Sequence, residues 1–173
     1  MKYAATLALI AILAAAITGC SRESVPDASA PQAAAPQSPY LTLAPGDDGF
    51  VAVPLSRISD KALYVNVPKE EAPLVQLLAI RDGGGIARIA FNTCQACNPS
   101  PRAWFAQRDD GRLVCQTCGT DFGPEAVGAA TRGCNPAPIP GVRETADAFL
   151  VPAAALDAAR PAFVRWAGPQ SSQ

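Results

Sequence analysis

Residues 86–97 read IARIAFNTCQAC, an apolar run that leads directly into a C-x2-C pair. Short runs of branched and aromatic residues bounded by turn residues are typical of strands. Just before this run, residues 82–85 read DGGG, which is typical of a tight turn because glycine tolerates positive φ. The stretch therefore predicts a strand that returns from a hairpin and ends in two cysteines.

Three more runs of this kind precede it: FVAVPL at 50–55, ALYVNV at 62–67 and PLVQLLAI at 73–80. Proline, Ser-Asp and glycine residues separate the runs at the spacing expected of hairpins. We therefore expect a mainly β fold, a small antiparallel-sheet domain of hairpins with little helix.

A weak internal repeat links the two ends of this domain. Residues 50–67 and 148–166 share the pattern Val-Pro-x3-Ile/Leu, at positions 53–58 and 151–156. We interpret each copy as a strand, a compact turn and a returning strand, with the two hairpins side by side in one sheet. The competing interpretation is a short helix over AAALDAAR, residues 153–160, because this segment has high helix propensity between two prolines.

Four cysteines form the pattern C-x2-C-x17-C-x2-C, the spacing of a four-thiolate metal site: Cys94, Cys97, Cys115 and Cys118. Two residues between cysteines let the backbone turn so that both sulfur atoms face one ion, and two such knuckles complete a tetrahedron. Gly119 suits the second knuckle because a residue without Cβ lets backbone N–H groups approach sulfur. The spacing predicts a double knuckle like that of rubredoxins and zinc ribbons.

Cys134 adds a fifth thiol. It could replace one knuckle sulfur as a cluster ligand, form part of a second metal position, or serve as a small buried residue. Soft thiolates select zinc, copper(I) or iron–sulfur clusters, and five thiolates without imidazole do not separate the three.

Two interpretations of the cysteines do not involve a metal. Exported proteins, of which this chain is expected to be one, are often stabilised by disulfide bridges. With Cys20 set aside as the expected lipidation site, however, five cysteines remain and a scheme of bridges alone leaves one thiol unpaired. One C-x2-C pair could instead be a thioredoxin-like redox couple, but such a couple opens a helix, and NPSP at 98–101 is a poor helix start.

The chain contains no histidine, and its 14 basic and 15 acidic residues nearly balance. Without imidazole no Ser-His or Cys-His nucleophile can form, so we expect no catalytic residues and no stand-alone enzyme. Because no basic stripe is present to neutralise phosphates, we expect no nucleic-acid partner.

The N-terminus is typical of an exported bacterial lipoprotein. Residues 1–19 hold one lysine and a short apolar run, and Ile-Thr-Gly-Cys at 17–20 resembles a lipobox, so Cys20 is the expected lipidation site. We expect a signal peptide at 1–19, a disordered tether at 20–40, one metal-binding domain at 41–168 and a disordered tail at 169–173. The expected location is the periplasm-facing envelope, with Ser21 favouring the outer over the inner membrane by analogy with other lipoproteins.

Three motifs in order, IARIAFNTCQAC, GRLVCQTCGTDF and GCNPAPIP, resemble the FtrD-like family of membrane iron–sulfur proteins. The resemblance covers roughly residues 50–160, and we expect a lipoprotein variant of the family. It implies an iron–sulfur centre and a role in bacterial iron transport, with envelope metal-transport or redox proteins as partners. It also implies that the functional set is Cys94, Cys97, Cys115, Cys118 and Cys134.

Two functional hypotheses follow from these patterns. The first is a lipid-anchored envelope protein whose thiolate-bound centre carries electrons or metal in iron or copper handling. The second is a structural zinc-ribbon-like module that mediates protein–protein contacts in the periplasm. A disulfide-stapled or thiol-redox protein is the further alternative.

Overall fold

The computed structural model describes residues 37–129 and 132–170, and within these residues the fold is mainly β. The predicted signal peptide, Cys20 and residues 20–36 of the predicted tether lie outside the described residues. The strands are β1 (Tyr40–Thr42), β2 (Phe50–Pro54), β3 (Leu63–Lys69), β4 (Ala72–Arg81), β5 (Ala87–Cys94), β6 (Phe105–Gln107), β7 (Leu113–Cys115), β8 (Asp121–Phe122), β9 (Pro136–Ala137), β10 (Arg143–Glu144) and β11 (Ala148–Pro152). One short α-helix, α1 (Ala153–Ala159), and the 3-10 turns η1 (Leu55–Arg57), η2 (Pro124–Ala126) and η3 (Arg160–Phe163) complete the described elements.

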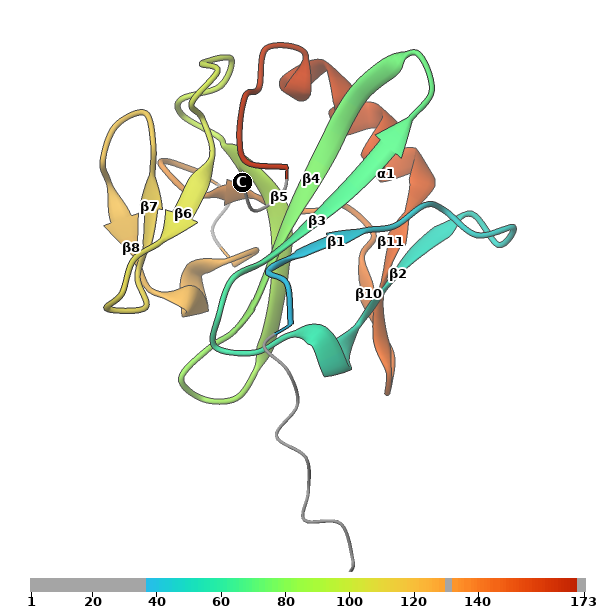
Figure 1. The fold of residues 1–173 in the computed structure, drawn as a ribbon, viewed down its shortest axis with the longest axis horizontal. Helices are drawn as coiled ribbons and strands as arrows, with labels where there is room; N and C mark the ends of the chain where they lie inside the picture. The colour runs from blue at the N-terminus through green and yellow to red at the C-terminus, as the bar shows by residue number, and fades with distance from the viewer. Residues whose placement is uncertain (1–36, 130–131, 171–173) are drawn as a thin grey trace, which may run out of the picture. The chain divides into compact units, whose positions relative to one another are not determined.

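The largest sheet has the strand order β1-β3-β4-β5-β9 (Figure 1). Its centre is the antiparallel meander β3-β4-β5, and β1 adds to β3 in parallel. The β4–β5 connection is the predicted turn, where the Asp82 carboxylate accepts hydrogen bonds from the N–H groups of Gly84 and Ile86. Gly85 has a φ of 81°, so glycine is required at this position. All four strands predicted before the first cysteine pair are therefore confirmed.

The two copies of the Val-Pro repeat form neighbouring strands, but the prediction that each copy is a hairpin is wrong. Strands β2 and β11 do lie side by side, antiparallel, with Val53 opposite Phe149 and Val51 opposite Val151 (Figure 1). In each copy the proline ends the strand and a helical turn follows, η1 in the first copy and α1 in the second. Proline has no N–H to continue the ladder, but it suits the start of a helical turn.

After the helical turn the two copies diverge. The first leads into β3, which pairs with β1 and β4 in the large sheet and not with β2. The second leads into η3 and no returning strand, so the alternative prediction of a short helix at 153–160 is the correct one. The repeat has a packing reason, because the last residue of each pattern, Ile58 or Leu156, is buried in the same core cluster.

Both faces of the large sheet are buried, each in its own apolar cluster. On β4 the alternating side chains divide, with Leu77 in one cluster and Leu78 and Ile80 in the other. The first cluster is completed by the sheet β10-β11-β2 and α1, which supply Val51 and Leu156. The second cluster is completed by the sheet β6-β7-β8, and it contains two of the cysteines. Burial on both faces explains why the β4 sequence is almost continuously apolar.

A row of three buried amide side chains crosses the meander on the side of the second cluster. The Gln76 side chain donates a hydrogen bond to Asn66 Oδ1 (2.7 Å), and the Asn92 side chain donates to Gln76 Oε1 (2.7 Å). Gln76 also donates to the carbonyl oxygen of Pro169, and Asn66 donates to that of Gln170 (2.6 Å). The row therefore holds the end of the described chain against the sheet.

Asn92 extends this row toward the cysteines. Its side-chain oxygen accepts the backbone N–H of Phe105 at the start of β6 (2.9 Å), and its carbonyl oxygen accepts the indole N–H of Trp166 (2.8 Å). Asn92 has no exposed surface, so neither bond can be replaced by water.

We expect Asn92→Ala to lower the free energy of unfolding by about 3 kcal/mol. The substitution removes the hydrogen-bond partners of the buried Phe105 backbone N–H and of the Gln76 side-chain oxygen Oε1. Urea unfolding of the reduced, metal-free protein measures this change. Glu70→Ala, in the exposed β3–β4 turn, is the control and should change stability by less than about 0.5 kcal/mol. A loss from Asn92→Ala no larger than that of the control would contradict the role given to this amide.

Candidate metal centre

Three separate segments bring the five predicted cysteines together. Cys94 ends β5 and Cys97 lies in the loop that follows, while Cys115 ends β7 and Cys118 lies in the next loop. The third segment brings Cys134, which lies just before β9. Because β9 pairs with β5, with Pro136 opposite Cys94, the third segment is held beside the first.

The two C-x2-C loops close in the same way. In the first, the N–H of Asn98 donates to the carbonyl oxygen of Cys94 (3.0 Å), and in the second the N–H of Gly119 donates to that of Cys115 (2.9 Å). Gly119 has a φ of 73°, a backbone conformation that favours glycine at this position of the second loop. The structure thus contains the double knuckle that the spacing predicts.

The cysteine sulfur atoms of the described chain fall into two groups of three. Within each group all sulfur atoms lie within 4.8 Å of one another, and the groups are Cys94, Cys97, Cys115 and Cys97, Cys118, Cys134. The Cys97 sulfur lies 3.8 Å from that of Cys115 and 3.9 Å from that of Cys134, and the sulfurs of Cys118 and Cys134 are 3.1 Å apart. All five are free thiols. The two knuckles therefore converge as predicted, and Cys134, whose role the sequence left open, lies beside them.

Exposure changes steadily across the cluster. Cys94 and Cys115 are buried at 0% and 1% exposure within the second core cluster, Cys97 and Cys134 are half-buried, and Cys118 is exposed. Phe105, fully buried, belongs to the same core cluster as the two buried cysteines and packs edge-on against Phe122, with ring centroids 5.2 Å apart. The cluster therefore has one side in the core and one side in water.

The pKa values of three of the thiols, Cys94, Cys97 and Cys118, are shifted from their ordinary value, two upward and one downward. Burial raises the pKa of Cys94 to about 11, although the backbone N–H groups of Cys97 and Ala96 favour its thiolate. Burial also raises the pKa of Cys97 far above its ordinary value. The pKa of Cys118 is lowered to about 6, chiefly by the hydroxyl of Thr120, 3.4 Å from its sulfur. The thiols of Cys94 and Cys97 therefore stay neutral unless a bound cation compensates the thiolate charge.

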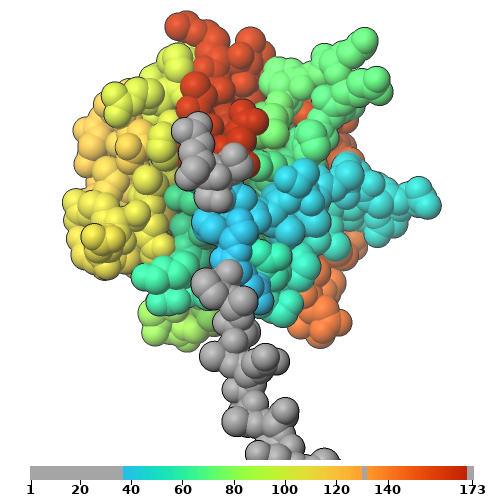
Figure 2. All heavy atoms as spheres, in the orientation of Figure 1, coloured from blue at the N-terminus to red at the C-terminus, as the bar shows by residue number. Residues whose placement is uncertain are grey.

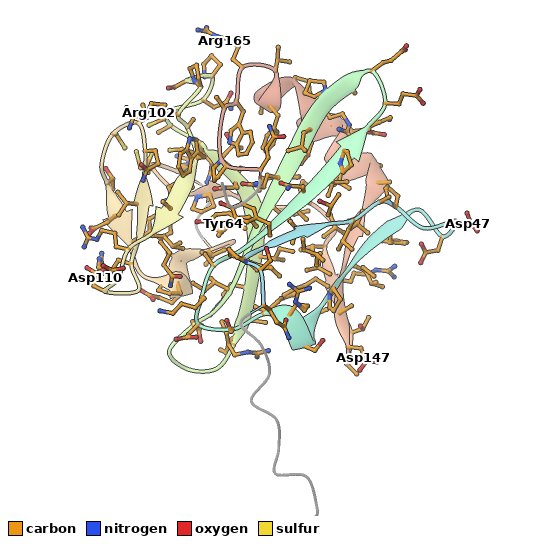
Figure 3. All side chains as sticks on the ribbon, in the orientation of Figure 1. Asp47, Tyr64, Arg102, Asp110, Asp147 and Arg165 are labelled. Atoms are coloured by element: carbon orange, nitrogen blue, oxygen red, sulfur yellow. The ribbon has the colours of Figure 1, made fainter. Side chains whose placement is uncertain are left out.

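Charged side chains beside the site are largely paired with one another. Arg108 and Arg112 both form ion pairs with Asp121, at 3.1 and 3.2 Å, and Arg108 also pairs with Asp110. Arg102 and Asp110 project outward on this side of the domain (Figure 3). Arg108, Arg112, Asp110 and Asp121 therefore form a partly solvent-exposed network of ion pairs with one another.

Asn98 is a site residue that the sequence analysis missed. Its side chain donates to the hydroxyl of Thr93 (3.0 Å) and to the carbonyl oxygen of Ala162 (2.7 Å), so it ties the first knuckle to η3. The N–H of Ala167 likewise donates to the carbonyl oxygen of Pro101 (2.8 Å), and the two segments adjoin in the space-filling view (Figure 2). An isolated asparagine before a proline gives no sequence pattern from which this role could be read.

The fold and the cluster define a class: a mainly β protein with a thiol-rich site suited to a soft metal. The chain matches the family described as membrane iron-sulfur containing protein FtrD-like over residues 58–163, more than half its length, and it belongs to that family. The match spans all five cysteines and most of the described strands. No curated protein and no solved structure matches the chain.

The family is described as a membrane family, and the part of the chain that the structure describes has no helix of sufficient length and apolarity to span a bilayer. The five thiols fit the family's iron–sulfur cofactor in donor chemistry, because such clusters are held by cysteine thiolates. The cysteine geometry and the family together establish a candidate metal or iron–sulfur site.

The exposure gradient predicts an order of thiol reactivity in the reduced, metal-free protein. Cys118 should be alkylated first, Cys134 and Cys97 later, and Cys94 and Cys115 only on unfolding, because a reagent cannot reach a buried sulfur. Timed alkylation followed by peptide mass spectrometry measures the order, with the urea-unfolded protein as the control in which all five react. Equal rates for Cys94 and Cys118 in the folded protein would refute the proposed arrangement.

Proposed function

We propose that this protein is a lipid-anchored carrier of the bacterial envelope, whose five cysteines hold a thiolate-bound centre that passes electrons or metal in iron or copper handling. The observation that carries the proposal is the convergence of five free thiols from three chain segments on one edge of the core. The family description supports an iron–sulfur centre as the first candidate for the bound group.

The position of the cluster suits a carrier. The buried side, with Cys94 and Cys115, is fixed by strand ends, so the inner ligands would keep their positions when the centre changes state. The exposed side, with Cys118 and half-buried Cys134, would place the centre within reach of a partner. A bound iron–sulfur cluster would supply one-electron transfer, at a potential set by hydrogen bonds to sulfur and by solvent exposure.

A structural zinc site is the second candidate, and one feature of the fold favours it. Between Cys115 and Cys134 the described chain forms only the two-residue strand β8 and the short turn η2. Such a segment buries little apolar surface by itself, and a metal ion could hold it to the sheet, as in zinc ribbons. In this case the domain would serve as a contact module for another envelope protein.

Metal analysis of protein purified without oxygen distinguishes the two candidates. The carrier proposal predicts iron with acid-labile sulfide and broad visible absorption that bleaches on reduction, and Cys115→Ser should lose both. Thr117→Ala, between the cysteines of the second knuckle, is the matched control and should retain them. One colourless zinc ion per chain would support the structural module, and protein that takes up no metal at all would overturn both.

Lipid anchoring is a separate part of the proposal and has its own test. Cys20→Ala should leave the chain without lipid, so the protein should leave the detergent-extracted membrane fraction, and mass spectrometry should find no lipidated N-terminus. Ser24→Ala, four residues further on, is the control and should remain lipidated. Ser21→Asp should move the lipoprotein from the outer to the inner membrane on a sucrose gradient. An unmodified N-terminus in the unaltered protein would refute the anchor.

A further inference from the structure

The sulfur atoms of the two outer cysteines lie closer together than a shared metal ion requires. Four thiolates bonded to one ion at about 2.3 Å form a tetrahedron with edges of about 3.8 Å. The Cys97 sulfur has neighbours at this separation, those of Cys115 at 3.8 Å and Cys134 at 3.9 Å. The sulfurs of Cys118 and Cys134, in contrast, are 3.1 Å apart. A disulfide bond is about 2.05 Å long, so this pair is about 1 Å from bonding distance.

Both members of this outer pair are accessible to a reagent in solution. Cys118 is exposed and Cys134 is half-buried. Cys94 and Cys115, by comparison, have 0% and 1% exposure, and each is the last residue of a strand. Oxidation of the cluster by a dissolved reagent therefore begins at the outer pair.

The competing pairing joins Cys118 to Cys115, its partner in the second knuckle, with which it also interacts. The backbone holds Cys115 in place, because its N–H donates to the carbonyl oxygen of Thr120 (3.0 Å). Cys134 instead follows Gly133, which has a φ of 87°, in a turn outside the strands. The short closing movement is therefore easier for Cys134 than for Cys115.

We propose that Cys118 and Cys134 form a reversible disulfide in the protein without a bound centre. The inference deepens the proposed function and rests on it, because it concerns the loading of the same thiol cluster in an oxidising envelope. The co-reactant is a disulfide, R–S–S–R. The Cys118 sulfur attacks it and releases one RSH, and the Cys134 sulfur then attacks Cys118 in the mixed disulfide and releases the second. Two hydrogens and two electrons pass from the cysteine pair to the co-reactant.

The bridge would control the loading of the site. It leaves the three thiols of Cys94, Cys97 and Cys115, whereas an iron–sulfur cluster is held by four thiolates. The oxidised protein would therefore be closed to the cluster until a dithiol reduces the bridge. The same bridge would restrain the segment between residues 118 and 134 while no centre does so. The five cysteines thus divide into three inner thiols and one switchable pair.

Thiol mapping tests the pairing. Full-length, metal-free protein is equilibrated without oxygen in mixtures of reduced and oxidised glutathione, and its free thiols are then blocked with N-ethylmaleimide in mildly acidic urea. We expect oxidised glutathione to convert two of the five cluster thiols into a Cys118–Cys134 bridge that dithiothreitol reverses. Cys134→Ser should stop at a glutathione adduct on Cys118. Thr117→Ala, between the cysteines of the second knuckle, is the control and should form the bridge.

Peptide mass spectrometry identifies the bridged cysteines. Cys115 and Cys118 lie on one tryptic peptide, which ends at Arg132, and Cys134 lies on the next, so fragment ions assign the bridge. A bridge between any other two cysteines would overturn the inference. Five unchanged cluster thiols in excess oxidised glutathione would overturn it as well.

Metal uptake separates this inference from the proposed function. Cobalt(II), whose thiolate complexes absorb strongly, is the probe because, unlike sulfide, it does not reduce disulfides. The bridged protein should bind cobalt more than about tenfold more weakly than the reduced protein, since it lacks a fourth thiolate. Equal binding by the two forms would overturn the control of loading. A bridge in protein that, once reduced, binds no cobalt, zinc or iron would overturn the proposed function, whereas metal uptake without any bridge would overturn this inference alone.

Discussion

The position of the two knuckles relative to each other depends on one buried amide, the side chain of Asn92. Asn92 lies two residues before Cys94 on β5, and its side chain accepts the N–H of Phe105 at the start of β6. Because β6 pairs with β7, with Phe105 opposite Cys115, this bond sets where the second knuckle lies relative to the first. The N–H of Cys94 adds a second tie, to the carbonyl oxygen of Ala103 (2.9 Å). Hydrogen bonds of this kind connect the central sheet to the sheet that carries the second knuckle, because no strand ladder joins the two sheets.

Local patterns in the sequence predicted the parts of the fold that local physics decides. Strands β2 to β5, the turn at 82–85 and the turn at Gly119 after the second C-x2-C pair follow from hydrophobic runs and glycine conformations within a few residues, whereas β1 was not predicted. The convergence of the two knuckles was also predictable, because the spacing itself indicates a shared site. Even the weak Val-Pro repeat was informative, since it marks two strands that pair with each other across about a hundred residues of chain.

The remaining features depend on contacts that no local pattern encodes. A helical turn follows Val-Pro in both copies, and the segments after it decide how far it continues: the first turn is short and leads into an apolar run that pairs with β4, whereas the alanine-rich second segment forms a helix. The roles of Asn92, Asn98 and Thr120 arise from single polar side chains that meet partners far along the chain or beside a sulfur. The split of the cysteines into two groups depends on ångström-scale positions, which spacing cannot give.

The placement of the cluster at the edge of the core reconciles two requirements of a soft-metal site. Thiolates buried in apolar surroundings are costly without a cation, so the buried thiols disfavour an empty, charged state. A fully buried centre, however, would be closed to any partner. The gradient from Cys94 to Cys118 meets both requirements, because the inner cysteines are held at strand ends and the outer cysteine is exposed to water beside Thr120. Near the outer cysteines in sequence, Arg108, Arg112, Asp110 and Asp121 pair with one another, so these four side chains add little net charge of either sign beside the thiols.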